Sequence, residues 1–227
     1  MRKKIVIVNP KGGSGKTTLA TNLASYFASR AGQPALLDFD PQGSSMHWLA
    51  ERPENLPEIH GIAAYEKRMG MTRSFQLRVP DDCQYVVVDS PAGYTAAELR
   101  EVTRDAHKVL MPVLPSRFDI AAASKAIADL LLVAKLDRER QQLGIVANRT
   151  RRNNKSFERL MRFLDSLGIP VVAVLRDSQN YVTASEFGVG LFDLKSHQIA
   201  KDRPEWERLL AFLDVETSVA KAARSGT

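Results

Sequence analysis

A glycine-rich segment near the start of the chain has the residue types and spacing that bind phosphate. It reads N-P-K-G-G-S-G-K-T-T over residues 9–18, after an apolar run and before a segment with helical spacing. Its glycines let the backbone turn tightly, so that N–H groups and the positive end of the next helix point at phosphate oxygens. Lys16 then reaches the β- and γ-phosphates of a nucleotide, and the Thr17 hydroxyl is a natural Mg²⁺ ligand. The predicted phosphate-binding residues are Gly12, Gly13, Ser14, Gly15, Lys16, Thr17 and Thr18.

This loop differs from the common G-x-x-x-x-G-K-[ST] pattern at one position and contains an additional lysine. That pattern requires glycine where Pro10 stands, and a second lysine, Lys11, lies at the mouth of the loop. Lys16 already fills the place of the phosphate-binding lysine. Lys11 therefore needs a separate explanation.

Two acidic segments could complete a magnesium–nucleotide site. The segment Y-V-V-V-D-S-P ends an apolar run with Asp89, and L-L-D-F-D-P-Q-G supplies Asp38 and Asp40. A carboxylate at the end of a neighbouring strand is what such a site requires, so we predict that Asp89 holds the metal through water. Residues 91–93 then make a turn close to the γ-phosphate. The alternative for Asp89 is a helix cap.

Short apolar runs alternate with helical segments along the chain. The predicted strands lie at Ile5–Val8, Ala35–Leu37, Tyr85–Val88, Val109–Val113, Leu143–Ala147 and Val171–Val174, and the predicted helices at Lys16–Arg30, Ala121–Leu136 and Ser156–Leu167. Continuous apolar runs are typical of strands covered on both faces. We therefore predict an α/β fold with a doubly wound, mostly parallel sheet flanked by helices, whose ligand binds at the carboxyl ends of the strands.

The remaining segments fit one domain over residues 1–215 and a flexible tail over residues 216–227. Residues 51–80 contain three prolines and two glycines, and predict an irregular excursion with a short helix around residues 62–68. The chain has 227 residues, one cysteine (Cys83) and a formal net charge of +6. One cysteine suits a reducing compartment. The apolar run before Asn9 is too short for a signal peptide, so we expect a cytoplasmic protein.

Three motifs in this order resemble the ParA/MinD family of deviant Walker A ATPases, and its ParA-like branch in particular. They are K-G-G-x-G-K-T-T, D-x-D-P-Q-G and V-V-V-D-x-P, and the resemblance covers nearly the whole chain. It implies a weak Mg²⁺-dependent ATPase that forms a homodimer with two ATP molecules between the subunits. Lys11 matches the lysine that crosses to the nucleotide of the other subunit, and Asp40 matches the acid that orients the attacking water.

The same resemblance suggests roles for other residues. Asp38 would support Mg²⁺ or the loop, and Asn148 would contact adenine. Ser116 and Asp119, in the segment M-P-V-L-P-S-R-F-D, would cap a helix. The family also implies a ParB-like or cargo-linked activator, with a plasmid, a chromosome or a protein assembly as the cargo.

A basic cluster over residues 149–162 points to nucleic acid. The segment contains one acidic residue, Glu158, and six basic residues: Arg149, Arg151, Arg152, Lys155, Arg159 and Arg162. Such a cluster suits sequence-neutral phosphate contacts, and would associate the ATP-bound protein with the nucleoid. A second basic surface could extend it, from Lys195, Lys201, Arg203 and Arg208. The alternative is a solvated helix face.

Three other functions stay open. A MinD-like protein would need a membrane anchor, but residues 205–215 have an acidic as well as basic polar face, and the tail lacks large apolar residues. We therefore expect no stable membrane anchor. An ATP-dependent ligase of the cobyrinate or dethiobiotin synthase type would share the loop and the fold. A non-enzymatic nucleotide-binding scaffold would not need Lys11, Lys16, Asp40 and Asp89 together.

Overall fold

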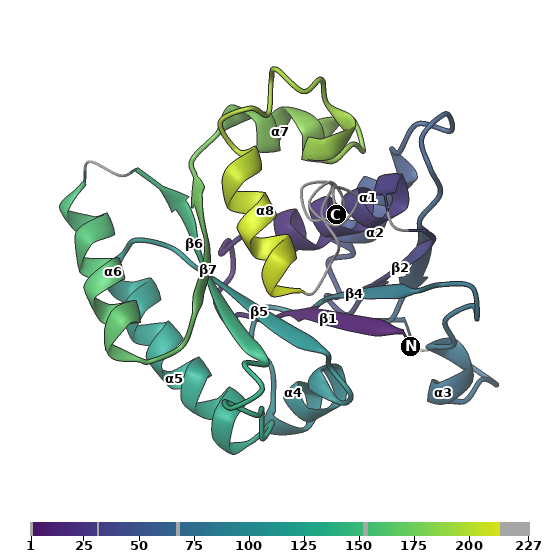
Figure 1. The fold of residues 1–227 in the computed structure, drawn as a ribbon. Coiled ribbons are helices and arrows are strands. Elements are labelled where there is room, and N and C mark those ends of the chain that lie inside the picture. Colours follow the sequence, from purple (N-terminus) through teal and green to yellow (C-terminus); the bar gives the residue numbers. More distant parts are fainter. Residues whose placement is uncertain (1, 31, 67–68, 152–153, 214–227) are drawn as a thin grey trace, which may run out of the picture.

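The computed structural model describes residues 2–30, 32–66, 69–151 and 154–213. Within these residues, seven strands form one sheet in the order β3-β2-β4-β1-β5-β6-β7, and all neighbouring strands are parallel (Figure 1). The strands are β1 (Lys3–Ile7), β2 (Pro34–Asp38), β3 (His60–Ala63), β4 (Tyr85–Asp89), β5 (Lys108–Val113), β6 (Leu143–Thr150) and β7 (Val171–Arg176). The predicted α/β fold with a parallel sheet is confirmed.

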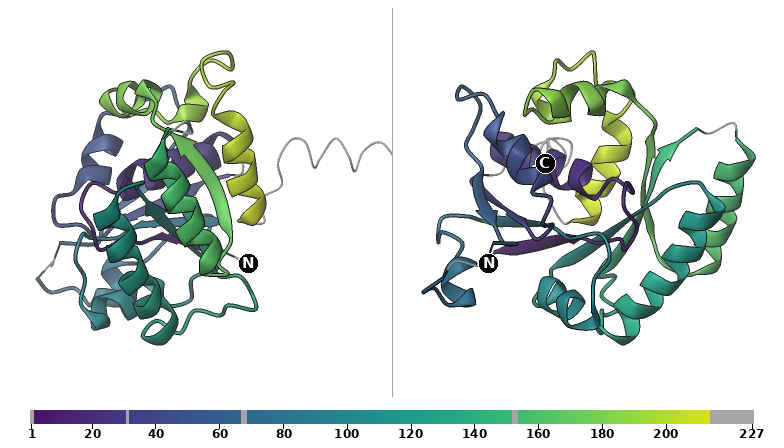
Figure 2. Two further views of the ribbon diagram at one scale, coloured as in Figure 1. Left: turned by 90° about the vertical axis from the view of Figure 1, so that its left-hand side faces the viewer. Right: turned by 180° about the vertical axis from the view of Figure 1, so that it is seen from behind.

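Helices cover both faces of this sheet. On one face lie α4 (Ala96–Thr103), α5 (Arg117–Leu132) and α6 (Lys155–Ser166). On the other lie α1 (Lys16–Arg30), α2 (Ser44–Ala50), α7 (Gln179–Glu186), the 3₁₀ turn η1 (Leu191–Asp193) and α8 (Arg203–Phe212). The short helix α3 (Arg73–Gln76) lies at the β3 end of the sheet. The two further views in Figure 2 show the same separation into three layers.

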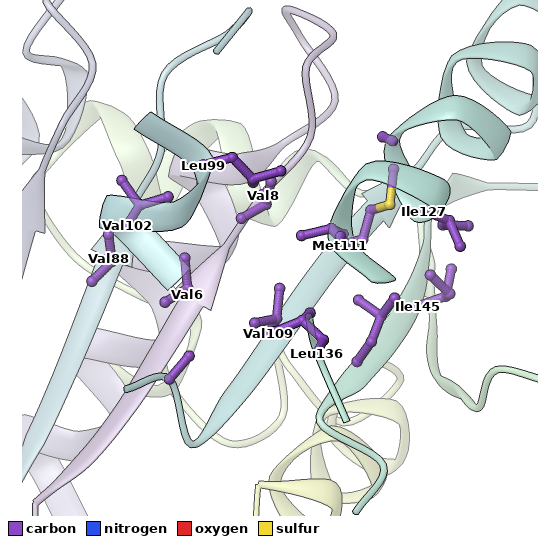
Figure 3. Close-up of a cluster of buried hydrophobic side chains, with 14 of the residues drawn as sticks. Val6, Val8, Val88, Leu99, Val102, Val109, Met111, Ile127, Leu136 and Ile145 are labelled. Atoms are coloured by element: carbon purple, nitrogen blue, oxygen red, sulfur yellow. The ribbon is translucent and has the colours of Figure 1, made fainter. Parts of the chain in front are cut away.

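The central strands are apolar on both sides because each side packs against a helical layer. Along β1, Val6 joins the core under α4 and α5, whereas Ile5 and Ile7 join the core under α1 and α8. Figure 3 shows the first of these cores, in which Val6 and Val109 from the sheet lie beneath α4 and α5. Side chains of a strand alternate between its faces, so a strand buried on both faces needs apolar residues at successive positions.

Residues 51–80 differ from the prediction. The expected short helix around residues 62–68 is wrong, because Ile62 and Ala63 belong to β3 and pair with Leu37 and Asp38 of β2. Residues 67–68 lie outside the described part of the chain. β3 is a four-residue edge strand with a single buried side chain, so it has no apolar run that the sequence could reveal.

The last described helix packs against the sheet. α8 buries Trp206, Leu209 and Leu210 in the core on the α1 side of the sheet. The expected flexible tail at residues 216–227 lies outside the described residues. No helix among residues 2–30, 32–66, 69–151 and 154–213 is both long and apolar enough to span a membrane.

Candidate functional site

The predicted phosphate loop and the acidic residues meet at the carboxyl edge of the sheet. β1 runs into the loop, and α1 begins at Lys16. Ile7, the last residue of β1, pairs with Asp89 at the end of β4, and Asp89 also pairs with Asp38 at the end of β2. Two carboxylates therefore lie on neighbouring strands, at the level where the loop leaves the sheet. This register comes from the parallel pairing alone.

Lys16 lies beneath the loop rather than on the surface. Its side chain is 6% exposed, and its ammonium is 3.5 Å from the Lys11 carbonyl oxygen. Burial lowers the pKa of Lys16, while the nearby charges of Asp89 and Asp40 partly oppose this shift. A desolvated ammonium attracts phosphate because the low local dielectric strengthens charge interactions, whereas the two carboxylates would repel phosphate unless a cation bound with it.

Asp89 has the environment of a cation ligand. It is fully buried, and neither of its carboxylate oxygens has a hydrogen-bond partner of good geometry within the described residues. Burial raises the pKa of Asp89 to about 7. The Thr17 hydroxyl opposes this shift most, the charge of Asp38 adds to it, and Lys16 and Ser45 oppose it further. Buried unpaired carboxylate oxygens beside a threonine hydroxyl fit Mg²⁺, which binds through one or two protein groups and completes its shell with phosphate and water.

Asp38 and Asp40 make different contacts although they are only two residues apart in the sequence. Asp38 is fully buried, and its carboxylate accepts backbone hydrogen bonds from Asp40 at 2.9 Å and from Ser45 at 3.1 Å. It therefore holds the D-x-D-P-Q-G segment and the start of α2. Asp40 is half-buried, and among the described contacts its carboxylate accepts only from the Gln42 N–H, so the second carboxylate oxygen remains available to a water molecule.

The turn after β4 rests directly on the phosphate loop. The N–H of Gly93 donates to the Pro10 carbonyl at 2.9 Å, and the Asn9 side chain accepts from the Lys11 N–H at 2.8 Å. Asn9 also donates to the Pro112 carbonyl of β5. The sequence pattern gave no reason to single out Asn9, because a buried amide at a strand end is recognisable only from its partners.

Lys11 has a partner that the sequence did not predict. Its ammonium lies 2.5 Å from the Asp119 carboxylate, which is 2% exposed, whereas the Lys11 side chain is 37% exposed. Ser116 caps α5 as expected by accepting from the Asp119 N–H, and its hydroxyl donates to the same Asp119 oxygen. In the single chain, Lys11 is thus held at the mouth of its own site by the first turn of α5.

Asn148 and the basic cluster lie at the other end of this edge. The Asn148 side-chain amide donates to the Ser14 carbonyl at 2.9 Å. Lys155, Arg159 and Arg162 are exposed on α6, and Arg151 forms an exposed ion pair with Asp177. Arg152 lies outside the described residues. Its predicted role remains untested.

A cavity of about 480 Å³ joins the two predicted basic surfaces. Arg151, Arg176 and Lys201 line it together with the acidic Asp202 and Glu205, beside the start of α8, and Arg176 is paired with Asp202. The sequence separates Arg151 from Lys201 by 50 positions, so only the fold brings these cations together.

The comparisons with known proteins agree with this arrangement. A family model described as the CobQ/CobB/MinD/ParA nucleotide binding domain matches residues 5–192. The chain is 28% identical to the maintenance of carboxysome distribution protein A of Halothiobacillus neapolitanus over 195 residues, which are 84% of this chain and 87% of that protein. It is 46% identical to the chromosome-partitioning ATPase Soj of Thermus thermophilus over 137 residues, 58% of this chain and 53% of that one.

Solved structures share the fold. A Cyanothece McdA variant in complex with ATP superposes with a TM-score of 0.72 at 17% identity, covering 95% of this chain and 98% of that chain. A cobyrinic acid a,c-diamide synthase from Mycobacterium smegmatis with ADP and magnesium has a TM-score of 0.59 at 18% identity, covering 83% and 93%. The family match spans the phosphate loop and both acidic strand ends. This chain belongs to the CobQ/CobB/MinD/ParA family of nucleotide-binding domains.

Proposed function

We propose that this protein is a ParA-like, Mg²⁺-dependent ATPase that closes into a homodimer around ATP, binds DNA without sequence preference and positions a cargo. The observation that carries this proposal is the grouping of Lys16, Asp89 and Asp40 at the carboxyl edge of the sheet. Lys11 is held at the mouth of this site. ATP and Mg²⁺ fit the loop and the unpaired Asp89 carboxylate. Related structures contain ATP, or ADP with magnesium.

The position of Lys11 supports a cross-subunit role. Lys16 already occupies the buried place beneath the loop, so the more exposed Lys11 serves a nucleotide from outside. A long ammonium side chain reaches the phosphates of a second subunit only when dimerisation presents it from the opposite side. The ion pair with Asp119 must then open as the dimer closes.

A test of the dimer separates the two lysines. Lys16→Ala should abolish ATP binding, because it removes the buried phosphate-binding charge. Lys11→Ala should keep ATP binding but lose ATP-dependent dimerisation and turnover. Light scattering with Mg²⁺ and ATP measures the mass directly. A normal dimer in Lys11→Ala would contradict the cross-subunit role.

The DNA surface is proposed on α6 and the adjoining cavity. Lys155, Arg159 and Arg162 stand at positions i, i+4 and i+7, so they share one side of the helix, and all three are exposed. Arg151 and Lys201 extend this surface across the cavity beside α8. Side-chain cations spread over two elements suit phosphate contacts along a duplex, which carry no sequence information.

Gel shifts on unrelated duplexes test this surface with a charge-matched control. Lys155→Ala combined with Arg159→Ala should weaken DNA retention by the ATP-bound protein while leaving the ATP-dependent dimer intact. Arg30→Ala combined with Arg78→Ala removes two exposed cations. Arg30 ends α1 and Arg78 follows α3, and both elements lie away from α6 (Figure 1). This control should bind DNA nearly as the wild type does. Equal losses in both variants would place DNA binding elsewhere.

A cargo-linked activator completes the proposed cycle, in the cytoplasm and at the nucleoid. The carboxysome and chromosome relatives support a positioning role over a small-molecule ligase. ATP turnover measured with DNA and without any small acceptor distinguishes these functions. Turnover that appears only with a small carboxylic acid acceptor would favour the ligase.

A further inference from the structure

We propose that Asn148 is a positioning residue that holds the phosphate-binding loop in its nucleotide-ready shape before a nucleotide binds. Asn148 lies near the carboxyl end of β6 and is 7% exposed. Its amide nitrogen donates to the Ser14 carbonyl at 2.9 Å, and its amide oxygen accepts from the Arg149 N–H at 3.0 Å. The proposal concerns nucleotide binding alone and does not depend on DNA binding or on a cargo.

The backbone of β6 is irregular where it aims this side chain. The pairing of β6 with β7 shifts register between Ala147 and Thr150. Arg149, inside this irregular stretch, has a φ of 48°, which is rare for a residue other than glycine. Bulges next to sites commonly redirect a side chain. Here the Asn148 oxygen accepts the hydrogen bond of the Arg149 N–H.

The two bonds fix which way the amide faces. If the Asn148 amide turned over, its oxygen would face the Ser14 carbonyl and its NH₂ group would face the Arg149 N–H. Both contacts would then be repulsive, and a buried donor and acceptor would lose their partners, at about 1–3 kcal/mol each. The nitrogen is therefore held toward the loop.

This contact orients a peptide group of the loop. Ser14 lies between Gly13 and Gly15, which have φ values of 73° and 95°. Because glycine has no Cβ atom, few steric restraints act on the backbone at these two positions. In a trans peptide the carbonyl and the next N–H point in opposite directions. Holding the Ser14 carbonyl against Asn148 therefore turns the Gly15 N–H away from Asn148, and a phosphate cradle requires N–H groups held in a fixed direction.

Gly15 is matched to Asn148 in shape as well. A Cβ atom at position 15 would overlap the Asn148 amide nitrogen, so the close approach of the two groups requires a glycine there. Asn9 holds the start of the same loop through the Lys11 N–H. Two buried amides, from the ends of β1 and β6, thus hold the loop on either side of its flexible glycines.

A base-free ligand distinguishes loop positioning from contact with the base. Calorimetry with Mg²⁺ and each of ATP, GTP and inorganic tripolyphosphate would measure affinity for the wild type, Asn148→Ala and Asn148→Leu. Loss of the hydrogen bond leaves the Ser14 carbonyl without its partner, so all three ligands should bind about ten-fold more weakly to both variants. Wild-type affinity for tripolyphosphate in the variants, with a loss for ATP alone, would overturn the proposal.

Asn22→Ala is the matched control. Asn22 is also a buried asparagine bonded at both ends of its amide, to the Thr18 carbonyl and the Leu191 N–H, but it makes no hydrogen bond to residues 9–15. Its affinity for the three ligands should stay within about two-fold of the wild type, because the loop keeps its contacts. A ten-fold loss in this control too would assign the effect to general destabilisation and overturn the proposal.

A hydrogen-exchange measurement on the wild type tests the proposal even if the Asn148 variants do not fold. In nitrogen-labelled, nucleotide-free protein, the Asn148 side-chain amide hydrogens should exchange with solvent at least about ten-fold more slowly than those of the exposed Asn154. Exchange as fast as that of Asn154 would show that the contact with Ser14 does not persist, and the proposal would be wrong.

Discussion

Asp89 is the residue at which folding stability and ligand binding oppose each other most directly. Its carboxylate is fully buried, lacks hydrogen-bond partners of good geometry, and has a pKa raised to about 7 by that burial. An ionised carboxylate in such a place destabilises the nucleotide-free fold. In the proposed site, Mg²⁺ bound beside Asp89 with a nucleotide would remove this penalty.

Asp89→Asn should therefore stabilise the nucleotide-free protein while abolishing its response to Mg²⁺ and ATP. At pH 8, above the raised pKa, the wild type carries the buried charge and the variant does not. Each kcal/mol changes the melting temperature of a chain of this size by about 2–4 °C, so we expect a rise of several degrees. Differential scanning fluorimetry with and without Mg²⁺ and ATP measures both effects. Asp81→Asn, at a 96% exposed side chain, should change neither.

Asp40 is suited to a role in ATP hydrolysis rather than in ATP binding. It is half-buried, and the backbone N–H groups that hold its segment in place donate to the Asp38 carboxylate. Asp40→Ala should keep ATP affinity and the closed dimer but slow hydrolysis by at least about 100-fold, the scale expected for a group that positions or activates water. Single-turnover hydrolysis and light scattering report the two properties separately. Hydrolysis at the wild-type rate would exclude Asp40 from orienting the water.

At the scale of elements, a buried ion pair ties the end of α2 to α1 and η1. Arg52 and Asp193 are 2.9 Å apart, with side chains that are 5% and 2% exposed. Ser25 of α1 donates to Asp193 at 2.6 Å, and Arg52 also donates to the Gly188 carbonyl. The segment of residues 184–194 is thus fixed to the helix that follows the phosphate loop.

Arg52→Ala should destabilise the fold strongly, because it leaves the Asp193 charge buried without its partner. Removing one member of a buried pair costs about 3–5 kcal/mol. Chemical denaturation measures this loss. Arg78→Ala, at an exposed cation, should change stability by less than about 0.5 kcal/mol.

The same network predicts how stability depends on pH. Burial by itself would raise the pKa of Asp193, but the hydrogen bonds from Arg52, Ser25 and the Gly190 N–H together lower it. A carboxyl whose pKa is lowered by folding contributes stability above its unfolded pKa and loses it as pH falls through the folded value. Asp193→Asn should therefore be less stable than the wild type at pH 7, and the difference should shrink below about pH 4. A difference that is constant from pH 7 to pH 3 would contradict this assignment.

At the scale of the whole molecule, the proposed dimerisation would act together with the positive charge of the chain. The chain carries a formal net charge of +6, and the cluster of residues 149–162 accounts for most of it. In the proposed ATP-bound dimer, two copies would present this surface twice, so the second contact with the same duplex would form at a high effective concentration. ATP would then control DNA binding through the assembly state alone.

Salt provides the corresponding measurement. With roughly five phosphate contacts per dimer, raising salt from ~50 to ~200 mM should weaken DNA binding by about two to three decades, because bound counterions are released. Unrelated duplexes should give the same slope. Lys155→Ala combined with Arg159→Ala should lower the slope, and an unchanged slope would remove α6 from the contact surface.

The sequence by itself determined the parts that depend on local pattern. The runs ending at Ile7 and Asp89 are apolar at successive positions, which specifies buried parallel strands, and α1 has the predicted bounds Lys16–Arg30. The order of the glycines, Lys16 and Thr17 determined the phosphate loop, because its chemistry depends on neighbours in the chain.

Only the tertiary structure decided which distant groups meet. β3 was missed because an edge strand with one buried residue carries no periodic signal, and its pairing with β2 alone makes it a strand. The contact of Lys11 with Asp119 spans 108 positions, and that of Asn148 with Ser14 spans 134. Polar side chains carry no periodicity that would disclose such partners. Their meeting follows from the strand order, which brings the ends of β1, β5 and β6 to one edge of the sheet.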